Sequence, residues 1–212
     1  MNDDGKPRLF ALDSTGRDLG NVDFKKADNK DWEDLASFTL DGDPYLLVAD
    51  IGDNLARRKK LRLYFAREPR PSEDKTKVDW HVDFEYPNGP RDAESAAVDI
   101  DNERVLILSK RDIPPALYEV PLQSDDDTVT AKWLGTIDSL PKPSRRDVEF
   151  APKTREWHWQ PTGMDISADN RAAVILTYRA IYYYTRKPGQ GWFEALNSTP
   201  VRVGLGNFRN AE

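Results

Sequence analysis

Acidic residues recur in short runs along this sequence, and each run precedes an apolar segment. The runs are Asp31 with Glu33 and Asp34, Asp92 with Glu94, and Asp147 with Glu149. Carboxylates held close together cannot all stay ionised unless a cation or hydrogen-bond donors join them. Hard oxygen ligands favour calcium, which takes about six to eight of them. The alternative is that these acids accept backbone N–H groups and pair with arginine.

A second candidate site is the segment Asp50-Ile51-Gly52-Asp53-Asn54, which ends an apolar stretch. As a structural element it is a tight turn with Asx hydrogen bonds. As a functional site it places Asp50 and Asp53 near Arg57 and Arg58, whose guanidinium groups suit an anion such as phosphate. The segment lacks the ligand spacing of an EF-hand loop.

Histidine and the aromatic residues offer few further candidates. Of the two histidines, His158 between Trp157 and Trp159 is the candidate general base, and packing is its alternative role. Trp32 is a candidate for stacking on a ligand, although such aromatic residues also fill cores. Nucleophile-elbow, P-loop and His-Glu-x-x-His motifs do not occur in the sequence.

Composition excludes several classes of function. The chain has no cysteine, which excludes disulfides, thiolate catalysis and zinc–thiolate sites. A net charge of -6 argues against a nucleic-acid surface, which needs a concentrated positive field. No run of about 18 apolar residues is present, so we expect no membrane span.

The elements that would position these residues are short strands, because the dominant apolar periodicity is two. Leu61, Leu63 and Phe65 alternate with other side chains, so a helix across 54–66 is not expected. We expect strand content above about 35 % and helix content below about 10 %. The expected strands are 33–38, 45–50, 94–99, 104–109, 162–167 and 171–178.

Three segments repeat one plan, beginning at residues 33, 94 and 162. Each has a strand of small residues, a tight turn, a strongly apolar strand and a further strand. A β-propeller blade is a four-stranded antiparallel meander with this order. The sequence therefore predicts an all-β, propeller-like array of four-stranded antiparallel blades, about three full blades with partial ones at both ends. A β-sandwich explains the strands but not their repeated order.

The repeat divides the chain into a single domain of successive units. These are a partial blade (1–30), three blades (31–90, 91–140 and 141–207) and the start of a further blade (208–212). A partial array leaves open strand edges, which attract another chain. We therefore expect a homo-oligomer with cross-chain strand contacts at 8–24 or 198–208. Loops 54–62 and 141–143 covering the edges are the alternative.

Several motifs resemble an uncharacterised bacterial β-propeller family, often exported, with phytase-like and gluconolactonase-like blades. They are Asp31-Trp32-Glu33-Asp34-Leu35-Ala36, Ala49-Asp50-Ile51-Gly52-Asp53-Asn54, Tyr86-Pro87-Asn88-Gly89 and Thr162-Gly163-Met164-Asp165-Ile166-Ser167. The resemblance implies a periplasmic or secreted protein of which this chain looks like an incomplete portion. Similar lactonases hold calcium with oxygens from successive inner strands, which implies the ligands Glu33, Asp50, Asn54 and Glu94.

Two functional hypotheses follow. The first is a binding or scaffold propeller, calcium-stabilised at the channel mouth, with Trp32, Asp53, Arg57 and Arg58 as ligand-binding candidates. The alternative is a calcium-dependent hydrolase of a lactone, a phosphoester or a similar small molecule. A small-molecule ligand is compatible with both hypotheses.

Overall fold

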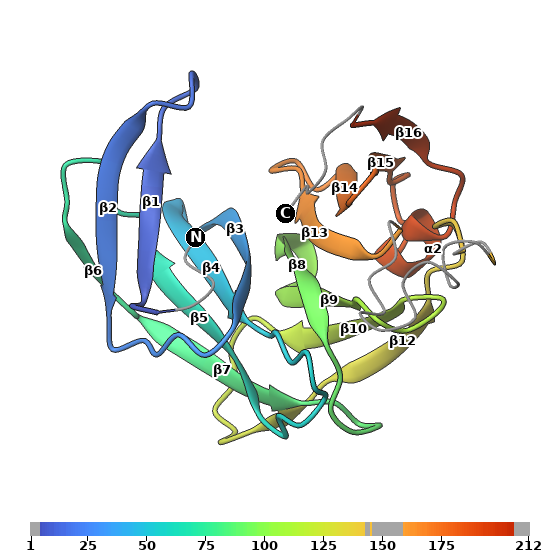
Figure 1. Cartoon of the computed structure of the whole chain (residues 1–212), viewed down its shortest axis with the longest axis horizontal. Coiled ribbons are helices and arrows are strands. Elements are labelled where there is room, and N and C mark those ends of the chain that lie inside the picture. Colours follow the sequence, from blue (N-terminus) through green and yellow to red (C-terminus); the bar gives the residue numbers. More distant parts are fainter. Residues whose placement is uncertain (1–4, 143–144, 146–158, 206–212) are drawn as a thin grey trace.

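The protein is all-β, as the sequence predicts. The computed structural model describes residues 5–142, 145 and 159–205, of which 51 % lie in strands and 5 % in helices. Four sheets follow one another along the chain and stand around a common axis (Figure 1). The fold is propeller-like, and the described sheets do not join into a closed ring.

Each sheet is built from strands that are consecutive in sequence, with two exceptions. The first sheet contains β1 (Arg8–Leu12), β2 (Asp18–Lys25) and the short β6 (Lys75–Lys77). The second contains β3 (Trp32–Leu40), β4 (Asp43–Asp50), β5 (Leu61–Arg67), β7 (Trp80–Glu85) and the short β11 (Val129–Thr130). The third contains β8 (Ala93–Asp99), β9 (Arg104–Ser109), β10 (Ala116–Pro121) and β12 (Lys132–Thr136). The fourth contains β13 (Pro161–Ile166), β14 (Ala172–Thr177), β15 (Ala180–Thr185) and β16 (Val201–Gly204). The helical elements are η1 (Ile100–Asn102) and α2 (Trp192–Leu196).

The strands β3, β8 and β13 are the innermost strands of their sheets. They contact one another across the axis, although each belongs to a different sheet (Figure 1). Small residues permit this close approach, as in β8, where Ala93, Ser95, Ala96 and Ala97 are all buried. The predicted strands 33–38, 45–50, 94–99, 104–109, 162–167 and 171–178 are therefore confirmed, with ends shifted by at most two residues.

Apolar side chains fill the spaces between neighbouring sheets. Leu9 and Phe24 of the first sheet pack on Val48 and Tyr64 of the second. A larger cluster joins the second sheet to the third, and another joins the third to the fourth and to α2. The core is therefore a series of sheet-on-sheet interfaces in which each sheet buries one face against the next.

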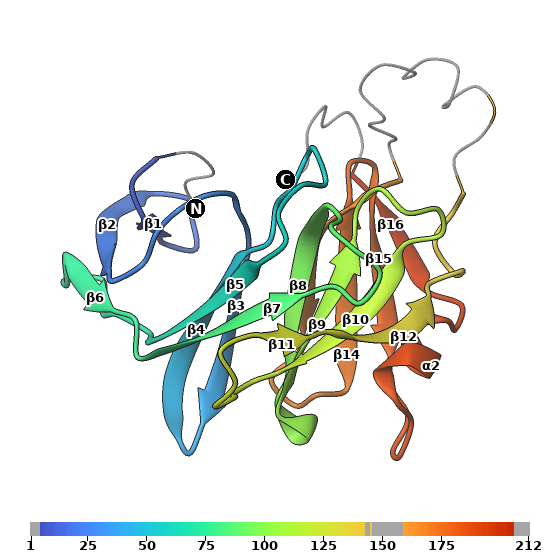
Figure 2. The ribbon, with the colours of Figure 1, turned by 90° about the horizontal axis from the view of Figure 1, so that it is seen from below.

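The two short strands β6 and β11 cross between sheets. Strand β6 leaves the second repeat to pair in parallel with β2, and β11 leaves the third repeat to pair in parallel with β7. Each crossing ties one sheet to the sheet before it (Figure 2). The sequence analysis did not predict either strand.

The basic segment after β4 forms a loop, not a helix. Residues 54–60 contain no helical residues, and β5 begins at Leu61, as the alternating apolar pattern predicts. Within the described ranges, no helix is long and apolar enough to cross a membrane.

Candidate functional site at the channel mouth

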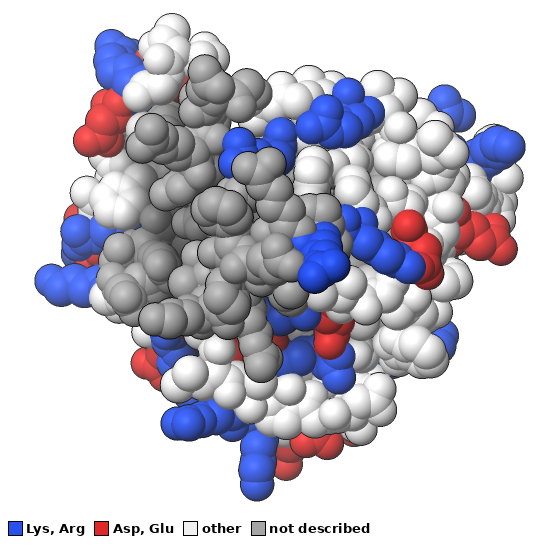
Figure 3. Space-filling view, turned by 45° about the vertical axis from the view of Figure 1, so that its right-hand side comes forward, with Lys and Arg blue, Asp and Glu red and all other residues white. Residues whose placement is uncertain are grey.

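Two of the three acidic runs, 31–34 and 92–94, lie where the innermost strands β3 and β8 begin. In each antiparallel pair the start of the inner strand faces the end of the next strand: Trp32 pairs with Asp50, Ala93 with Ser109 and Pro161 with Thr177. We call this end, comprising residues 31–34, 50–54, 92–95, 109–111 and 160–162, the channel mouth. Acidic and basic side chains lie close together on the molecular surface in Figure 3.

Asp50 and Arg58 close the loop between β4 and β5. Asp50 is buried, and its carboxylate accepts Arg58 Nη2 at 2.6 Å and the backbone N–H of Lys30 at 3.2 Å. Arg58 Nη1 also donates to the carbonyl of Gly52 at 2.6 Å, and the Arg58 N–H donates to Asp53 at 2.7 Å. Two predicted ligand-binding residues, Asp53 and Arg58, thus hold the loop in shape.

Asp92 and Arg111 connect this loop to the third sheet. The buried Asp92 carboxylate accepts the Asp53 N–H at 2.9 Å and Arg111 Nε at 2.6 Å. The same guanidinium donates to the side-chain oxygen of Asn54. The predicted alternative, in which acids and arginines link one blade to the next, is realised at this point.

Glu94 in β8 and Lys110, which follows β9, form a buried ion pair. The Lys110 ammonium also lies 5.4 Å from the ring centroid of Tyr178, which follows β14 in the fourth sheet. Burial alone lowers the pKa of Lys110, but the charge and hydrogen bond of Glu94 outweigh it, so the pKa is raised. Lys110 therefore remains an ammonium and contacts two sheets.

Asp34 is the residue that links all three innermost strands. Its carboxylate accepts the N–H of Leu35 in β3 at 2.9 Å, of Ala96 in β8 at 2.7 Å and of Met164 in β13 at 3.1 Å. Burial raises the pKa of Asp34 to about 7, against the opposing effect of these three donors. The sequence analysis grouped Asp34 with its neighbours but did not assign it a role. The signal that could have identified this role is the position of an acidic residue inside a predicted strand of the repeat.

Glu33 lies against the turn that follows β4. A Cβ atom added to Gly52 would collide with the carboxyl groups of both Asp31 and Glu33. The absence of a side chain at Gly52 therefore lets the two acids approach the backbone of the neighbouring segment.

The four predicted calcium ligands do not fit a calcium site as they lie. Asp50 pairs with Arg58, Glu94 with Lys110, and the Asn54 oxygen with Arg111. Among the described residues, no group of three or more histidine, aspartate or glutamate side chains has a geometry that could hold a metal ion. The fourth residue, Glu33, has its own interaction partners. Calcium binding stays a prediction to be tested in solution.

The remaining predicted site residues are Trp32, Arg57 and His158. Trp32 is buried in the core, where its Nε1 donates to the Asp28 carbonyl at 2.9 Å and its ring packs against Phe24 and Tyr64. This position corrects the prediction that Trp32 stacks on a ligand and agrees with the packing alternative. Arg57 is exposed on the loop. His158, with Asp147 and Glu149, lies outside the described residues.

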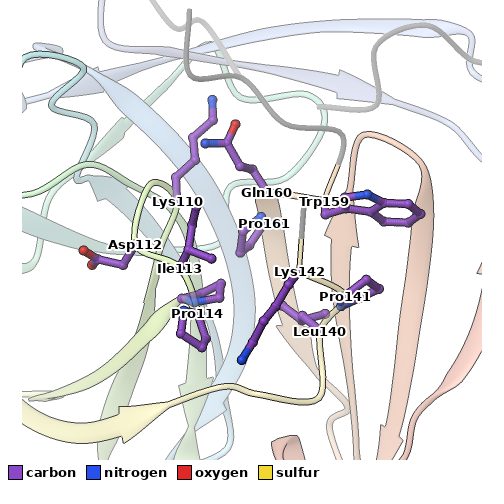
Figure 4. Close-up of a pocket in the computed structure, with 11 residues that line it drawn as sticks. Lys110, Asp112, Ile113, Pro114, Leu140, Pro141, Lys142, Trp159, Gln160 and Pro161 are labelled. Atoms are coloured by element: carbon purple, nitrogen blue, oxygen red, sulfur yellow. The ribbon is translucent and has the colours of Figure 1, made fainter. Parts of the chain in front are cut away.

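A small surface hollow, open to solvent, adjoins the buried ion pair. Its walls are mainly apolar and include Ile113, Pro114, Leu140 and Pro161. The polar ends of Lys110 and Gln160 lie next to each other at its rim (Figure 4). The hollow thus combines apolar walls with the ammonium and amide groups of two buried residues.

Comparisons with known proteins show likeness in structure but not in sequence. No family model and no curated protein matches the chain. The periplasmic gluconolactonase PpgL of Pseudomonas aeruginosa has 11 % identity and a TM-score of 0.45, with 95 % of this chain and 52 % of that chain covered. A candidate 6-phosphogluconolactonase from Bacteroides uniformis has 15 % identity and a TM-score of 0.41, with 96 % and 50 % covered. The chain spans about half the length of these two propeller-like proteins.

Proposed function

We propose that this chain is a binding propeller whose channel mouth, with the adjoining hollow, takes a small polar molecule. The observation that supports this proposal is Lys110, a buried ammonium at the rim of an open hollow with mainly apolar walls. Small-molecule sites commonly combine apolar walls with a few convergent polar groups. Among the described residues, Glu94 and Tyr178 engage two of the three donors of the Lys110 ammonium.

The chemistry of the hollow favours a molecule with an apolar face and a hydrogen-bonding edge. Ile113, Leu140 and the proline rings offer only apolar contact, whereas Lys110 and Gln160 offer donors. The positive charge of Lys110 is already balanced by Glu94. Strong affinity for multiply charged anions is therefore not expected, and a neutral or singly charged molecule fits better.

A thermal-shift comparison tests this proposal with four probes: glucose, glucono-1,5-lactone, gluconate and inorganic phosphate. We expect at least one of the first three to raise the melting temperature in a concentration-dependent way. Lys110→Met should remove the shift, whereas Lys132→Met, which alters an exposed pair with Glu119 on an outer strand, should keep it. Because Lys110→Met also breaks an ion pair, Gln160→Ala serves as a second variant that should weaken the shift. No shift with any probe would contradict the proposal.

Calcium stabilisation of the mouth and calcium-dependent hydrolysis of a lactone or phosphoester remain finer alternatives. They are separated from simple binding by a hydrolysis assay with a lactone and a phosphomonoester, each with calcium and with a chelator. Turnover that needs calcium would favour the hydrolase, and a bound probe that is recovered unchanged would favour a binding protein.

Self-association belongs to the same proposal. The segments 8–24 and 198–208 contain β1 and β16, and each of these strands forms an edge of its sheet. Exposed edge strands are templates for pairing with another chain. We therefore propose that the protein forms homo-oligomers.

A further inference from the structure

The fourth sheet has an apolar face that no described element covers. One of its faces packs on the third sheet through Met164, Ile175, Tyr182 and Tyr184. The residues that alternate with these point to the opposite face, which we call the terminal face. Its members are Gly163, Asp165, Val174, Leu176, Ile181, Tyr183, Val201 and Val203.

Strand pairing arranges the terminal face into two rows across all four strands. Asp165 pairs with Val174, Val174 with Tyr183, and Tyr183 with Val201. The second row joins Gly163, Leu176, Ile181 and Val203 in the same way. Cross-strand neighbours of this kind form a continuous surface, so the terminal face is one patch.

Strand β16 shows that the terminal face is not an ordinary solvent-facing surface. Val201 and Val203 point outward and are 63 % and 52 % exposed. Arg202, between them, is also exposed but lies on the other side of the strand, with its guanidinium carbon 5.8 Å from the ring centroid of Trp159. A strand with water on its outer side normally places its polar residue outward and its valines inward. The reversed order indicates a face that is buried against a partner.

The first sheet also exposes apolar side chains on its outer face, at the other end of the array, beside Asn21 and the Arg8–Asp23 ion pair. Leu9, Val22 and Phe24 point into the molecule, whereas Phe10 and Leu12 on β1 are 50 % and 63 % exposed. Leu19 on β2 adds to this patch, which we call the leading face. The two faces lie at opposite ends of the row of sheets, with β1 and β2 far from β16 (Figure 1).

We propose that the leading face of a second copy of this chain docks on the terminal face. All neighbouring sheets within the chain already stack in this manner, with the apolar face of one sheet against the next. The contact therefore repeats the sheet-on-sheet packing within the chain. Every copy carries both of the faces that meet in it. The interface is heterologous, because two different faces meet in it.

Light scattering after size-exclusion chromatography tests the proposal on the full chain over a concentration series. The wild type should exceed its 24.2 kDa chain mass, and Val203→Glu or Phe10→Glu should each reduce the assembly. A mixture of these two variants should recover a species of twice the chain mass, because each variant keeps one intact face. Trp133→Glu, at an exposed site on β12, is the matched control and should leave the mass unchanged.

Cross-linking identifies the faces directly. Because the chain has no cysteine, Phe10→Cys and Val203→Cys introduce single thiols, and mild oxidation of their mixture should give a disulfide-linked heterodimer. A wild-type monomer at every concentration would overturn the proposal. An assembly that survives Phe10→Glu, or one whose thiols do not cross-link, would do the same, because it would point to edge pairing or to a symmetric contact.

Discussion

At the scale of single residues, the polar groups of the channel mouth connect sheets to one another. Asp34 joins three inner strands, Arg111 joins the second sheet to the third, and Lys110 joins the third to the fourth. Buried polar groups are costly unless they are satisfied, so each of these residues stabilises one particular arrangement of the sheets. Two of them lead to predictions that do not depend on the proposed ligand.

Asp34 should make folding stability depend on pH. Its pKa is raised to about 7 in the folded state, above the value near 3.9 of an unfolded aspartate. Between these values the folded protein holds a proton that the unfolded chain releases, so stability should fall as the pH rises from about 4 to about 7 and then level off. Urea unfolding from pH 4.5 to 8 should show this slope reduced in Asp34→Asn, whose amide oxygen still accepts N–H groups. Equal pH profiles for wild type and variant would contradict the role of Asp34.

The Glu94–Lys110 pair should behave as a buried ion pair. Lys110→Met leaves an unpaired buried carboxylate and should destabilise the protein by roughly 3–5 kcal/mol. Adding Glu94→Gln should restore part of this loss, because no uncompensated charge then remains. The exposed Lys132→Met control should cost no more than about 1 kcal/mol. Chemical denaturation of wild type, the two single mouth variants, the double variant and the Lys132→Met control completes the comparison, and additive effects of the two mouth substitutions would refute the coupling.

At the scale of elements, alternation made the strands predictable. Leu61, Leu63 and Phe65 alternate clearly enough to favour β5 over a helix, and the three repeated hairpins follow from small and strongly apolar segments. Strands β6 and β11 have only three and two residues, too few for a pattern to appear. Both strands form by pairing with a strand of a neighbouring sheet, and the local sequence carries no information about that pairing.

The site was harder to predict than the fold, because its contacts join distant segments. The sequence placed Asp50 near Arg58, but the partners of Asn54 and Glu94, which are Arg111 and Lys110, became visible only when the strands were placed. Trp32 looks like a surface aromatic beside two acids. Strand pairing turns its ring toward the first sheet, where Phe24 covers it.

Gly135 provides a test of how β12 and α2 fit together. Its φ of +139° disfavours any side chain, and an added Cβ would lie 2.5 Å from the ring of Phe193 in α2. Gly135→Ala should therefore destabilise the protein by about 1–3 kcal/mol, through overpacking and backbone strain. Gly191→Ala, where no atom lies within 4 Å of the added Cβ, should stay within about 0.5 kcal/mol of wild type. Urea midpoints that are equal for the two variants would show that α2 is not packed as described.

At the scale of the whole molecule, the arrangement resembles a stack of sheets more than a single core. Neighbouring sheets stabilise each other through the faces that they bury together, and polar bridges at the mouth fix the order of the sheets. Repeat arrays of this kind have stabilities close to a sum of units and interfaces. A ligand that binds across several sheets should therefore stabilise the whole array. Calcium binding at the mouth would then raise the melting temperature of the whole protein.

Calcium should produce no such stabilisation if the ion pairs at the mouth persist in solution. Binding would require Arg58, Lys110 and Arg111 to release oxygens of Asp50, Glu94 and Asn54, and these cations would then lie beside a divalent ion. We therefore expect equal melting temperatures in calcium and in a chelator. A true site would instead add RT ln(1 + [L]/Kd), about 2.7 kcal/mol at a hundredfold excess over Kd. A rise of that size that Glu94→Gln abolishes would show that the cations are displaced and that the sequence-based calcium assignment is correct.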